Sequence, residues 1–317
     1  MTCYLVTGGA GFIGANLVEE LLRRGARVRV LDNLATGRAE NLAPFRGDVE
    51  FIEGDLRDPA CVRRAVAGVE IVLHQAALPS VPRSVADPLT SNEVNVTGTV
   101  QLLVAARDAG VRRVVAASSS SVYGNSPTLP KVETMPTEPL SPYAVSKLAT
   151  ERYCQAFTQV YGLPTIALRY FNVFGPRQDP TSQYSAVIPK FIALLLRGES
   201  PLIHGDGRQS RDFTYVDNVV AANLLAAEAP PEVSGYFNVA CGDRVSLLDL
   251  VARLNALLGT AIPARHGPPR PGDVRDSQAD IGTIRRLLGY EPVVGFDEGL
   301  ARTLAYFRRP VAPAQAA

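Results

Sequence analysis

Tyr143 and Lys147 stand four residues apart and form the pair in this sequence best suited to acid–base chemistry. Residues four apart on a helix share one face, so the lysine ammonium can approach the tyrosine phenol. A cation beside a phenol stabilises the phenolate and lowers its pKa, which predicts Tyr143 as a general base. Only three of the 32 cationic side chains are lysines, and a compact ammonium differs from the planar fork of arginine. The lysine at position 147 therefore favours a chemical role for this pair.

Four consecutive serines, Ser118 to Ser121, follow a predicted strand at residues 114–117. Ligands bind at the carboxyl edge of a parallel sheet in open α/β folds. One of the four hydroxyls could bridge a substrate oxygen and the Tyr143 phenol, while others satisfy the loop backbone. The run alone leaves open which serine this is.

Three glycines at three-residue spacing, Gly8, Gly11 and Gly14, lie between a predicted strand at 4–7 and a predicted helix at 12–24. Glycines there let the backbone approach a pyrophosphate, whose charge then lies at the positive end of the helix. Asp32 follows the next predicted strand, and its carboxylate can accept both ribose hydroxyls of an adenosine while repelling a 2′-phosphate. This pattern predicts a bound dinucleotide and favours NAD over NADP.

Asp55 follows the strand predicted at 49–52 and has two possible roles. It could lie near the adenine of the dinucleotide, at the same edge of the sheet as Asp32. It could instead cap the helix that starts near Pro59. The residues alone favour neither role.

The first half of the chain alternates strand and helix patterns. Strands are predicted at 4–7, 28–31, 49–52, 69–73, 114–117 and 164–168, and helices at 12–24, 94–109 and 143–161. Strands separated by helices imply right-handed crossovers and a parallel sheet covered on both faces. The predicted fold class is therefore α/β, a Rossmann-like doubly wound parallel sheet with a smaller C-terminal α/β substrate domain.

Prolines cluster in the second half of the chain, which predicts a domain boundary just after Asn172. Residues 1–172 are predicted to bind NAD, and residues 173–317 to form the substrate domain. The helix and strand predicted within 216–239 could return to the first sheet. The tail after Pro310 is expected to fray.

Composition excludes several classes of protein. The 317 residues are 46% hydrophobic and 20% charged, with a net charge of +1, which gives no support to nucleic-acid binding. The four cysteines are scattered and are expected to be free thiols in a reducing cytoplasm, with no metal site. No apolar run reaches the ~18 residues of a membrane helix, and no signal peptide is recognised.

Several motifs in order carry a family resemblance. TGGAGFIG at 7–14, Asp32-Asn33, Gly54-Asp55, the serine run, YAVSK at 143–147 and RYFN at 169–172 resemble the extended short-chain dehydrogenase/reductase family. Within it the chain is similar to the UDP-hexose 4-epimerases. The bacterial branch acting on UDP-N-acetylglucosamine resembles it most, through HQAALPSVPRSV, GPRQDP, YSAVIPKF, SRDFTYV and RPGDVRDSQAD. The resemblance covers roughly residues 2 to 305.

The resemblance implies a role for each matching position. The catalytic residues would be Ser119, Tyr143 and Lys147. The NAD contacts would be Gly8, Gly11, Phe12, Ile13, Gly14, Asp32, Asn33, Asp55, Leu56, Ala76, Asn95, Tyr143, Lys147 and Tyr170. The UDP-sugar contacts would be Ser80, Ser119, Asn172, Ala186, Val187, Arg211, Arg270, Asp273 and Ser277. It also implies a homodimer packed through the helices near 95–109 and 143–161.

The implied reaction is transient oxidation at C4 of the sugar, rotation of the 4-keto sugar and return of hydride to its opposite face. By the same resemblance, Ser277 would lie beside the 2-substituent of the sugar, where a small residue leaves room for an acetamido group. The expected substrates are therefore both UDP-GlcNAc/UDP-GalNAc and UDP-Glc/UDP-Gal. Pro79 departs from relatives that place Lys or Gly beside the sugar.

Three other functions are weighed against this one. A sugar-nucleotide dehydratase needs acidic residues where this chain has Ser120 and Ser121. A UDP-uronate epimerase or decarboxylase needs an extra cation near the sugar, for which Arg83 and Arg177 are candidates. A catalytically silent NAD-binding regulator could lack the Tyr143–Lys147 pair, which this chain keeps.

Overall fold

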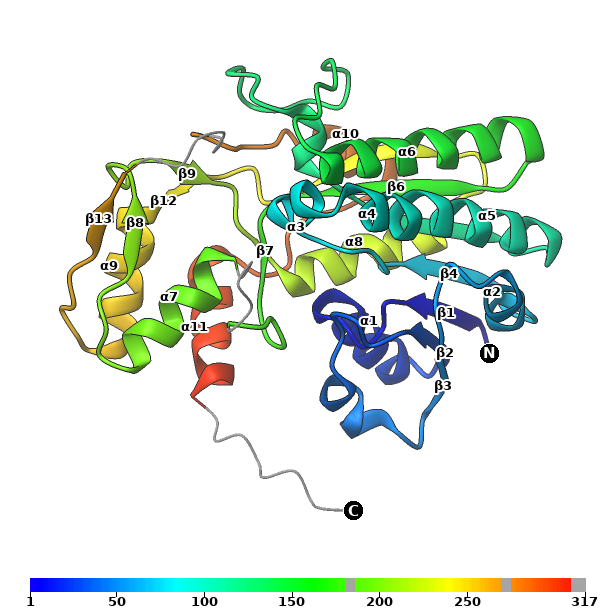
Figure 1. Ribbon diagram of the computed structural model, residues 1–317, viewed down its shortest axis with the longest axis horizontal. Coiled ribbons are helices and arrows are strands. Elements are labelled where there is room, and N and C mark those ends of the chain that lie inside the picture. Colours follow the sequence, from blue (N-terminus) through cyan, green and yellow to red (C-terminus); the bar gives the residue numbers. More distant parts are fainter. Residues whose placement is uncertain (181–185, 269–274, 309–317) are drawn as a thin grey trace.

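A seven-stranded parallel sheet forms the centre of the molecule (Figure 1). A computed structural model describes residues 1–180, 186–268 and 275–308. The strand order across the sheet is β11-β6-β5-β4-β1-β2-β3. The strands are β1 Cys3–Thr7, β2 Arg27–Asp32, β3 Val49–Glu53, β4 Ile71–His74, β5 Arg113–Ser119, β6 Thr165–Tyr170 and β11 Gly235–Val239. The predicted Rossmann-like sheet is confirmed.

The order of the strands reverses at β1, which has β2 on one side and β4 on the other. Successive strands thus move away from β1 in both directions, and a crevice opens outside its carboxyl end. Such a switch point is where open α/β sheets bind ligands. The glycine loop that follows β1 is therefore placed in the binding crevice by topology alone.

Helices cover both faces of the sheet (Figure 1). Helices α2 Pro59–Val66, α5 Gly98–Asp108 and α6 Pro142–Tyr161 pack on one face. Helices α1 Phe12–Arg23 and α8 Val216–Glu228 pack on the other. Strand β1 shows the consequence, since Tyr4 and Val6 join one core and Cys3 and Leu5 the other. Both faces being buried explains why the strands are apolar throughout.

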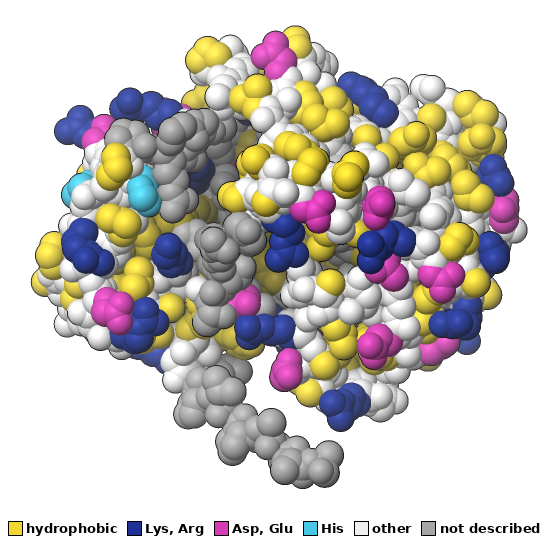
Figure 2. All heavy atoms as spheres, viewed as in Figure 1, with side chains coloured by type: hydrophobic (Ala, Val, Ile, Leu, Met, Phe, Trp, Pro, Cys, Tyr) yellow, Lys and Arg dark blue, Asp and Glu magenta, His cyan; other side chains and the backbone are white. Residues whose placement is uncertain are grey.

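The helix predicted at 94–109 differs from the structure in its first turn. Residues Glu93–Thr97 form a π-helical turn, and the α-helix begins at Gly98. Two short helices, α3 Val81–Ala86 and α4 Pro88–Asn92, precede it. Exposed hydrophobic side chains, yellow in Figure 2, cluster over α4, α5 and α6.

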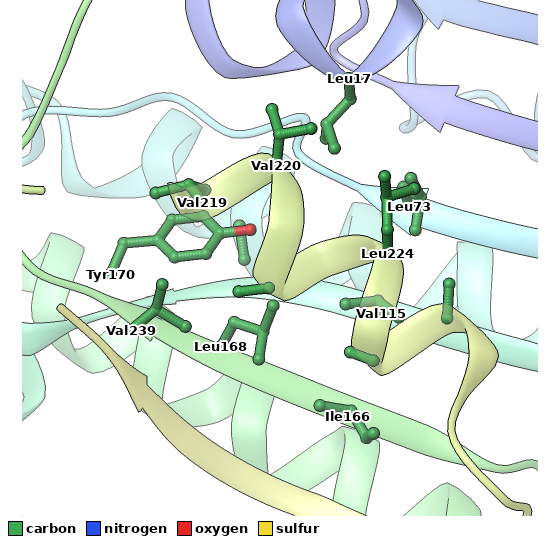
Figure 3. Close-up of a cluster of buried hydrophobic side chains, with 14 of the residues drawn as sticks. Leu17, Leu73, Val115, Ile166, Leu168, Tyr170, Val219, Val220, Leu224 and Val239 are labelled. Atoms are coloured by element: carbon green, nitrogen blue, oxygen red, sulfur yellow. The ribbon is translucent and has the colours of Figure 1, made fainter. Parts of the chain in front are cut away.

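The chain leaves this sheet after β6 and returns to it with α8 and β11. Strand β11 pairs in parallel with β6 and completes one edge of the sheet. Figure 3 shows Val219, Val220 and Leu224 of α8 among side chains of the sheet and of α1. The buried guanidinium of Arg113 binds the carbonyls of Ala229, Pro230 and Val233, so it satisfies the backbone between α8 and β11.

A second lobe lies beside the sheet and has its own core (Figure 1). Its helices are α7 Val187–Leu196, α9 Leu247–Leu258 and α11 Phe296–Phe307, while α10 Gly282–Leu288 packs against α8 and β11. Its strands form short pairs: β7 Val173–Phe174 with β10 Thr214–Tyr215, β8 Leu202–His204 with β13 Arg265–Gly267, and β9 Ser210–Arg211 with β12 Val245–Ser246. Within the described ranges, no helix has the length and apolar character needed to cross a membrane.

Candidate functional site

A cavity of about 700 Å³ opens at the carboxyl edge of the sheet, at the β1 switch point. It receives residues from the glycine loop, from the ends of β2 to β6 and from the start of the second lobe. Fifteen of the predicted site residues line it: Gly8, Gly11, Phe12, Ile13, Gly14, Asp32, Asn33, Asp55, Leu56, Ala76, Ser80, Tyr143, Lys147, Tyr170 and Ala186. One continuous space therefore joins the predicted dinucleotide residues to the tyrosine–lysine pair.

Two glycines of the loop, Gly8 and Gly14, have no room for a side chain. Gly8 has φ +68°, and a Cβ there would lie 2.7 Å from the backbone nitrogen of Ala76. A Cβ on Gly14 would lie 2.1 Å from the carbonyl oxygen of Gly8. Gly11 precedes α1 and supplies no side-chain cap, which leaves the first N–H groups of α1 available to an anion. This cradle fits the pyrophosphate of a dinucleotide.

Asp32 is buried at the end of β2 and lines the cavity. One carboxylate oxygen accepts the Ala10 N–H at 2.9 Å and the other the Leu34 N–H at 2.8 Å. Burial raises the pKa of this carboxyl, and the two backbone bonds oppose that shift. Each oxygen keeps a further lone pair, so the carboxylate can still accept ribose hydroxyls.

Asp55 lines the same cavity and does not cap a helix. Its carboxylate binds Arg57 and accepts a 2.8 Å bond from the Asn33 amide. The hydrogen bond from Arg57 lowers the pKa of Asp55. The cap of α2 is Asp58, which accepts the Ala60 N–H at 2.9 Å. Of the two roles considered for Asp55, the helix cap is therefore wrong.

Tyr143 lies in the first turn of α6, where Ser141 caps the helix and the Tyr143 N–H donates to Ser84 Oγ at 3.0 Å. Ser119 lies close enough to the phenol to lower its pKa. Burial raises the pKa of Tyr143 and outweighs the lowering by Ser119. The expectation that a neighbouring cation lowers this pKa is not met, because burial dominates.

The position of Lys147 explains why its charge does not lower the pKa of Tyr143. Its Nζ donates to the Ala117 carbonyl at 2.9 Å and lies 5.9 Å from the centroid of the Tyr143 ring. Burial lowers the pKa of Lys147 to about 8. The ammonium is thus held by backbone at the end of β5, alongside the phenol and out of direct contact with it.

The structure distinguishes two of the serines. The Ser118 hydroxyl donates to Glu151 Oε1 at 2.5 Å and is committed to that carboxylate. Ser119 Oγ accepts the Ser121 N–H at 3.2 Å and is close enough to the Tyr143 phenol to lower its pKa. The geometry thus favours Ser119 as the serine that acts with Tyr143, although Ser119 does not line the cavity.

The buried side chain of His74 connects the end of β1 to α5 through two threonine hydroxyls. Thr99 Oγ1 donates to the Asn95 carbonyl, so it must accept from His74 Nε2 at 2.9 Å. His74 Nδ1 then accepts from Thr7 Oγ1 at 2.7 Å. Burial lowers the pKa of His74 to about 3, with the charge of Lys147 acting in the same direction, so the ring is neutral.

Asn95, a predicted NAD contact, does not line the cavity and instead binds the backbone of Leu78, which does. Its amide oxygen accepts the Leu78 N–H at 2.7 Å, and its nitrogen donates to the Leu78 carbonyl and to Ser146 Oγ. Ser146 in turn donates to the Tyr143 carbonyl at 2.7 Å. The π-helical turn therefore fixes the 76–80 segment and the start of α6 together.

The predicted UDP-sugar residues lie partly outside the cavity. Asn172, Val187, Arg211 and Ser277 are not among its lining residues, and Arg270 and Asp273 lie outside the described residues. Asn172 has φ +35°, and its amide donates to Ser277 Oγ and to the Asp212 carbonyl, both at 3.0 Å. The Arg211 guanidinium binds the carbonyls of Ser210 and Arg275. Asn172 and Ser277, which the resemblance assigned to the substrate, are thus in contact.

The two candidate uronate cations differ in their surroundings. Both Arg83 and Arg177 line the cavity. The Arg177 guanidinium binds Asn16 Oδ1 and Glu19 Oε2, each at 2.7 Å, so it faces α1 and not the tyrosine. Arg83 follows Ser80, whose hydroxyl caps α3.

Residues 4–240 match the model of the NAD dependent epimerase/dehydratase family. The UDP-glucose 4-epimerase of Mycolicibacterium smegmatis is 42% identical over 96% of this chain and 98% of its own. A UDP-N-acetyl-alpha-D-glucosaminuronate decarboxylase of Bacillus cytotoxicus is 31% identical over 96% of this chain and 97% of its own.

Two solved structures share the fold over nearly the whole length. The UDP-N-acetylglucosamine 4-epimerase of Methanobrevibacter ruminantium, in complex with UDP-N-acetylmuramic acid, gives a TM-score of 0.92 at 42% identity, over 96% of this chain and 98% of that one. The UDP-glucose 4-epimerase of Thermus thermophilus, in complex with NAD, gives 0.88 at 40% identity, over 97% of this chain and 99% of that one.

Proposed function

Because the chain belongs to the NAD dependent epimerase/dehydratase family, we propose that it is a UDP-hexose 4-epimerase. The observation that carries the proposal is the placement of Tyr143 and Lys147 in the same cavity as the glycine loop and Asp32, with Ser119 close to Tyr143 at the end of β5. A dinucleotide in the cradle would extend along this cavity towards the phenol. The extended short-chain dehydrogenase/reductase resemblance agrees with this family.

Each of these residues has a defined task in the proposed reaction. Bound NAD supplies the hydride acceptor and donor for C4 of the sugar. Tyr143 removes the proton from the sugar O4 and returns it later, with Ser119 holding the phenol in position. Lys147, fixed by the Ala117 carbonyl, keeps a positive charge on the same side of the phenol.

For the substrate we propose both the acetylated and the plain sugars, UDP-GlcNAc/UDP-GalNAc and UDP-Glc/UDP-Gal. Ser277 supports this choice, because its side chain is small and its hydroxyl accepts from Asn172, another residue that the resemblance assigns to the substrate. The relatives named above include enzymes for each sugar type.

Incubation of the purified protein with UDP-glucose, UDP-N-acetylglucosamine and UDP-glucuronate separately tests this proposal, with product stereochemistry read by NMR. We expect C4 epimers of the first two. Tyr143→Phe keeps the ring but loses the base, so we expect turnover to fall about 100- to 10,000-fold with the fold intact. Near-wild-type turnover by this variant would refute the role of Tyr143.

The alternative is a UDP-uronate epimerase or decarboxylase, which Arg83 in the cavity and the decarboxylase relative support. Product from UDP-glucuronate alone would favour it. A catalytically silent NAD-binding regulator would convert none of the three sugars while still releasing NAD on acid treatment. The same assay therefore separates all three functions.

We further propose a homodimer that acts in the cytoplasm, where the four free cysteines would stay reduced. The proposed interface involves α5 and α6. Apolar side chains exposed on or near these helices support it: Val85 and Leu89, 64% and 77% exposed, and Val145 and Val160 of α6, 52% and 71% exposed. Light scattering after gel filtration would test it, and a monomer at micromolar concentration would contradict it.

A further inference from the structure

One face of α6 contacts three consecutive residues at the end of β5, which are Ala117, Ser118 and Ser119. Tyr143, Lys147 and Glu151 are spaced by four and so share a helix face. Tyr143 contacts Ser119, Lys147 binds the Ala117 carbonyl, and Glu151 accepts from the Ser118 hydroxyl. Glu151 is the one member of this face that the proposed reaction does not use.

Glu151 is held in place by a second group of bonds. It forms an ion pair with Arg169 of β6, in which both side chains are completely buried. Arg169 Nε donates to Oε1 at 2.8 Å and Nη2 to Oε2 at 2.7 Å, a two-point contact that fixes the plane of the carboxylate. The guanidinium also lies over the rings of Tyr123 and Tyr236, at 4.7 and 4.2 Å from their centroids. A fully buried ion pair is weak evidence for a gain in stability, whereas it does fix geometry.

The bonds continue towards the segment that carries Ser277. Arg169 Nη1 donates to the Tyr123 hydroxyl, whose own hydrogen goes to Asn238 Oδ1 at 2.6 Å. Asn238 Nδ2 donates to the carbonyls of Lys131 and Asp280. Each donor named in this hydrogen-bond network has an acceptor, so the orientation of each group is set by its neighbours.

We propose that Glu151 is a positioning residue for the epimerase reaction: by accepting the Ser118 hydroxyl it fixes the end of β5 so that Ser119 lies close to Tyr143. The inference rests on the proposed function for the role of Tyr143. Glu151 itself touches no reacting atom and acts through Ser118.

Loss of the hydrogen bond between Ser118 and Glu151 should change the pKa of Tyr143. Ser119 lowers the pKa of Tyr143, so a displaced Ser119 leaves that pKa higher. A base of higher pKa is deprotonated only at higher pH, and the rising limb of the pH–rate profile therefore moves upward. Neither Ser118 nor Glu151 is among the residues assigned to UDP-sugar or to NAD, so KM and cofactor content should change little.

Ser118→Ala, Glu151→Gln and the double variant test the proposal, with kcat, KM, bound NAD and the pH–rate profile measured for each. We expect each single variant to lose about tenfold in kcat at neutral pH, with KM within about twofold of wild type. The double variant should lose no more kcat than the more impaired of the two single variants, because the two residues act as one unit. Thr158→Ala is the matched control, since it removes a structural hydroxyl that binds the Leu163 carbonyl and Thr165 at the far end of α6.

A tyrosinate absorbance titration gives a readout that needs no turnover. Each variant is compared with the same variant carrying Tyr143→Phe, and the difference reports Tyr143 alone. If the Tyr143 pKa is raised in Ser118→Ala and unchanged in Thr158→Ala, the result supports the proposal even if no sugar is converted. A wild-type protein that converts no sugar overturns the proposed function only. An unchanged pKa and kcat in Ser118→Ala overturns the inference. If Glu151→Gln fails to fold, Ser118→Ala alone decides between these outcomes.

Discussion

Ser277 is fixed from two sides, since its N–H donates to the Ser210 carbonyl and its hydroxyl accepts from Asn172. Replacing it by tyrosine adds a ring at a position that these two hydrogen bonds hold in place. Overpacking a formed site costs roughly 1–3 kcal/mol, which corresponds to a tenfold to hundredfold loss of turnover. We expect Ser277→Tyr to suppress conversion of the acetylated sugars and to spare the plain ones, measured as kcat/KM on each. Equal loss on both would show that Ser277 does not select the sugar.

His74 makes stability depend on pH. The folded protein keeps this ring neutral down to a pKa of about 3, whereas an unfolded histidine takes up a proton near pH 6.5. The unfolded state therefore binds more protons between these values, and the stabilisation that is complete above pH 6.5 is lost as the pH falls. One proton contributes a slope of at most ~1.4 kcal/mol per pH unit.

The variant His74→Asn should remove that part of the slope. Denaturant unfolding at several pH values between 6.5 and 4 measures it for both proteins. We expect the free energy of unfolding to fall less steeply with acid in the variant, which is also less stable at neutral pH. Parallel slopes in the two proteins would contradict the assignment.

The site residues that sequence could predict are those whose type and spacing carry their own chemistry. Gly8, Gly14 and Asp32 need only a strand and a helix around them, and Tyr143 and Lys147 need only one helix. Glu151 and His74 could not be predicted in this way, because their partners lie on other strands and helices. The same reason explains the error on the Tyr143 pKa, since burial of a phenol depends on the whole cavity wall.

At the scale of elements, the turn from β1 into α1 depends on its glycines. Gly14→Ala would place a methyl group 2.1 Å from the Gly8 carbonyl, so the first turn of α1 must move away from the loop. We expect this variant to release most of its NAD and to lose roughly 1–3 kcal/mol of stability. Gly47→Ala, where nothing lies within 4 Å, is the matched control and should keep both properties. Cofactor released by acid and the midpoint of denaturation are the measurements.

The ends of helices and strands could be predicted where the pattern of apolar residues is continuous. The strand predicted at 28–31 is Arg27–Asp32, and the helix predicted at 143–161 is Pro142–Tyr161. The helix predicted from residue 94 contains a π-helical turn first, and apolar spacing cannot reveal a turn whose Asn95 binds a distant backbone.

At the scale of the molecule, the predicted NAD-binding half is not a continuous stretch of chain in the structure. Its sheet needs β11, and its core needs α8, both of which follow residue 172. Burial of Val219, Leu224, Phe237 and Val239 contributes roughly 1.5–3 kcal/mol each, a sum comparable with the ~5–15 kcal/mol that keeps a domain folded. We expect residues 1–172 expressed alone to lack a cooperative thermal transition and to bind no NAD. A folded fragment with the affinity of the full chain would show that this half is autonomous.

The late arrival of β11 also bears on how the chain is synthesised. While the ribosome makes the residues between β6 and β11, strand β6 has an unpaired edge and the surface that α8 will cover is open to water. An unpaired apolar edge is the kind of surface on which nascent chains aggregate. Closing it requires a pairing between segments far apart in sequence, which is a slow step in folding. The emerging chain therefore passes through an interval in which a holding chaperone would have an exposed edge to bind.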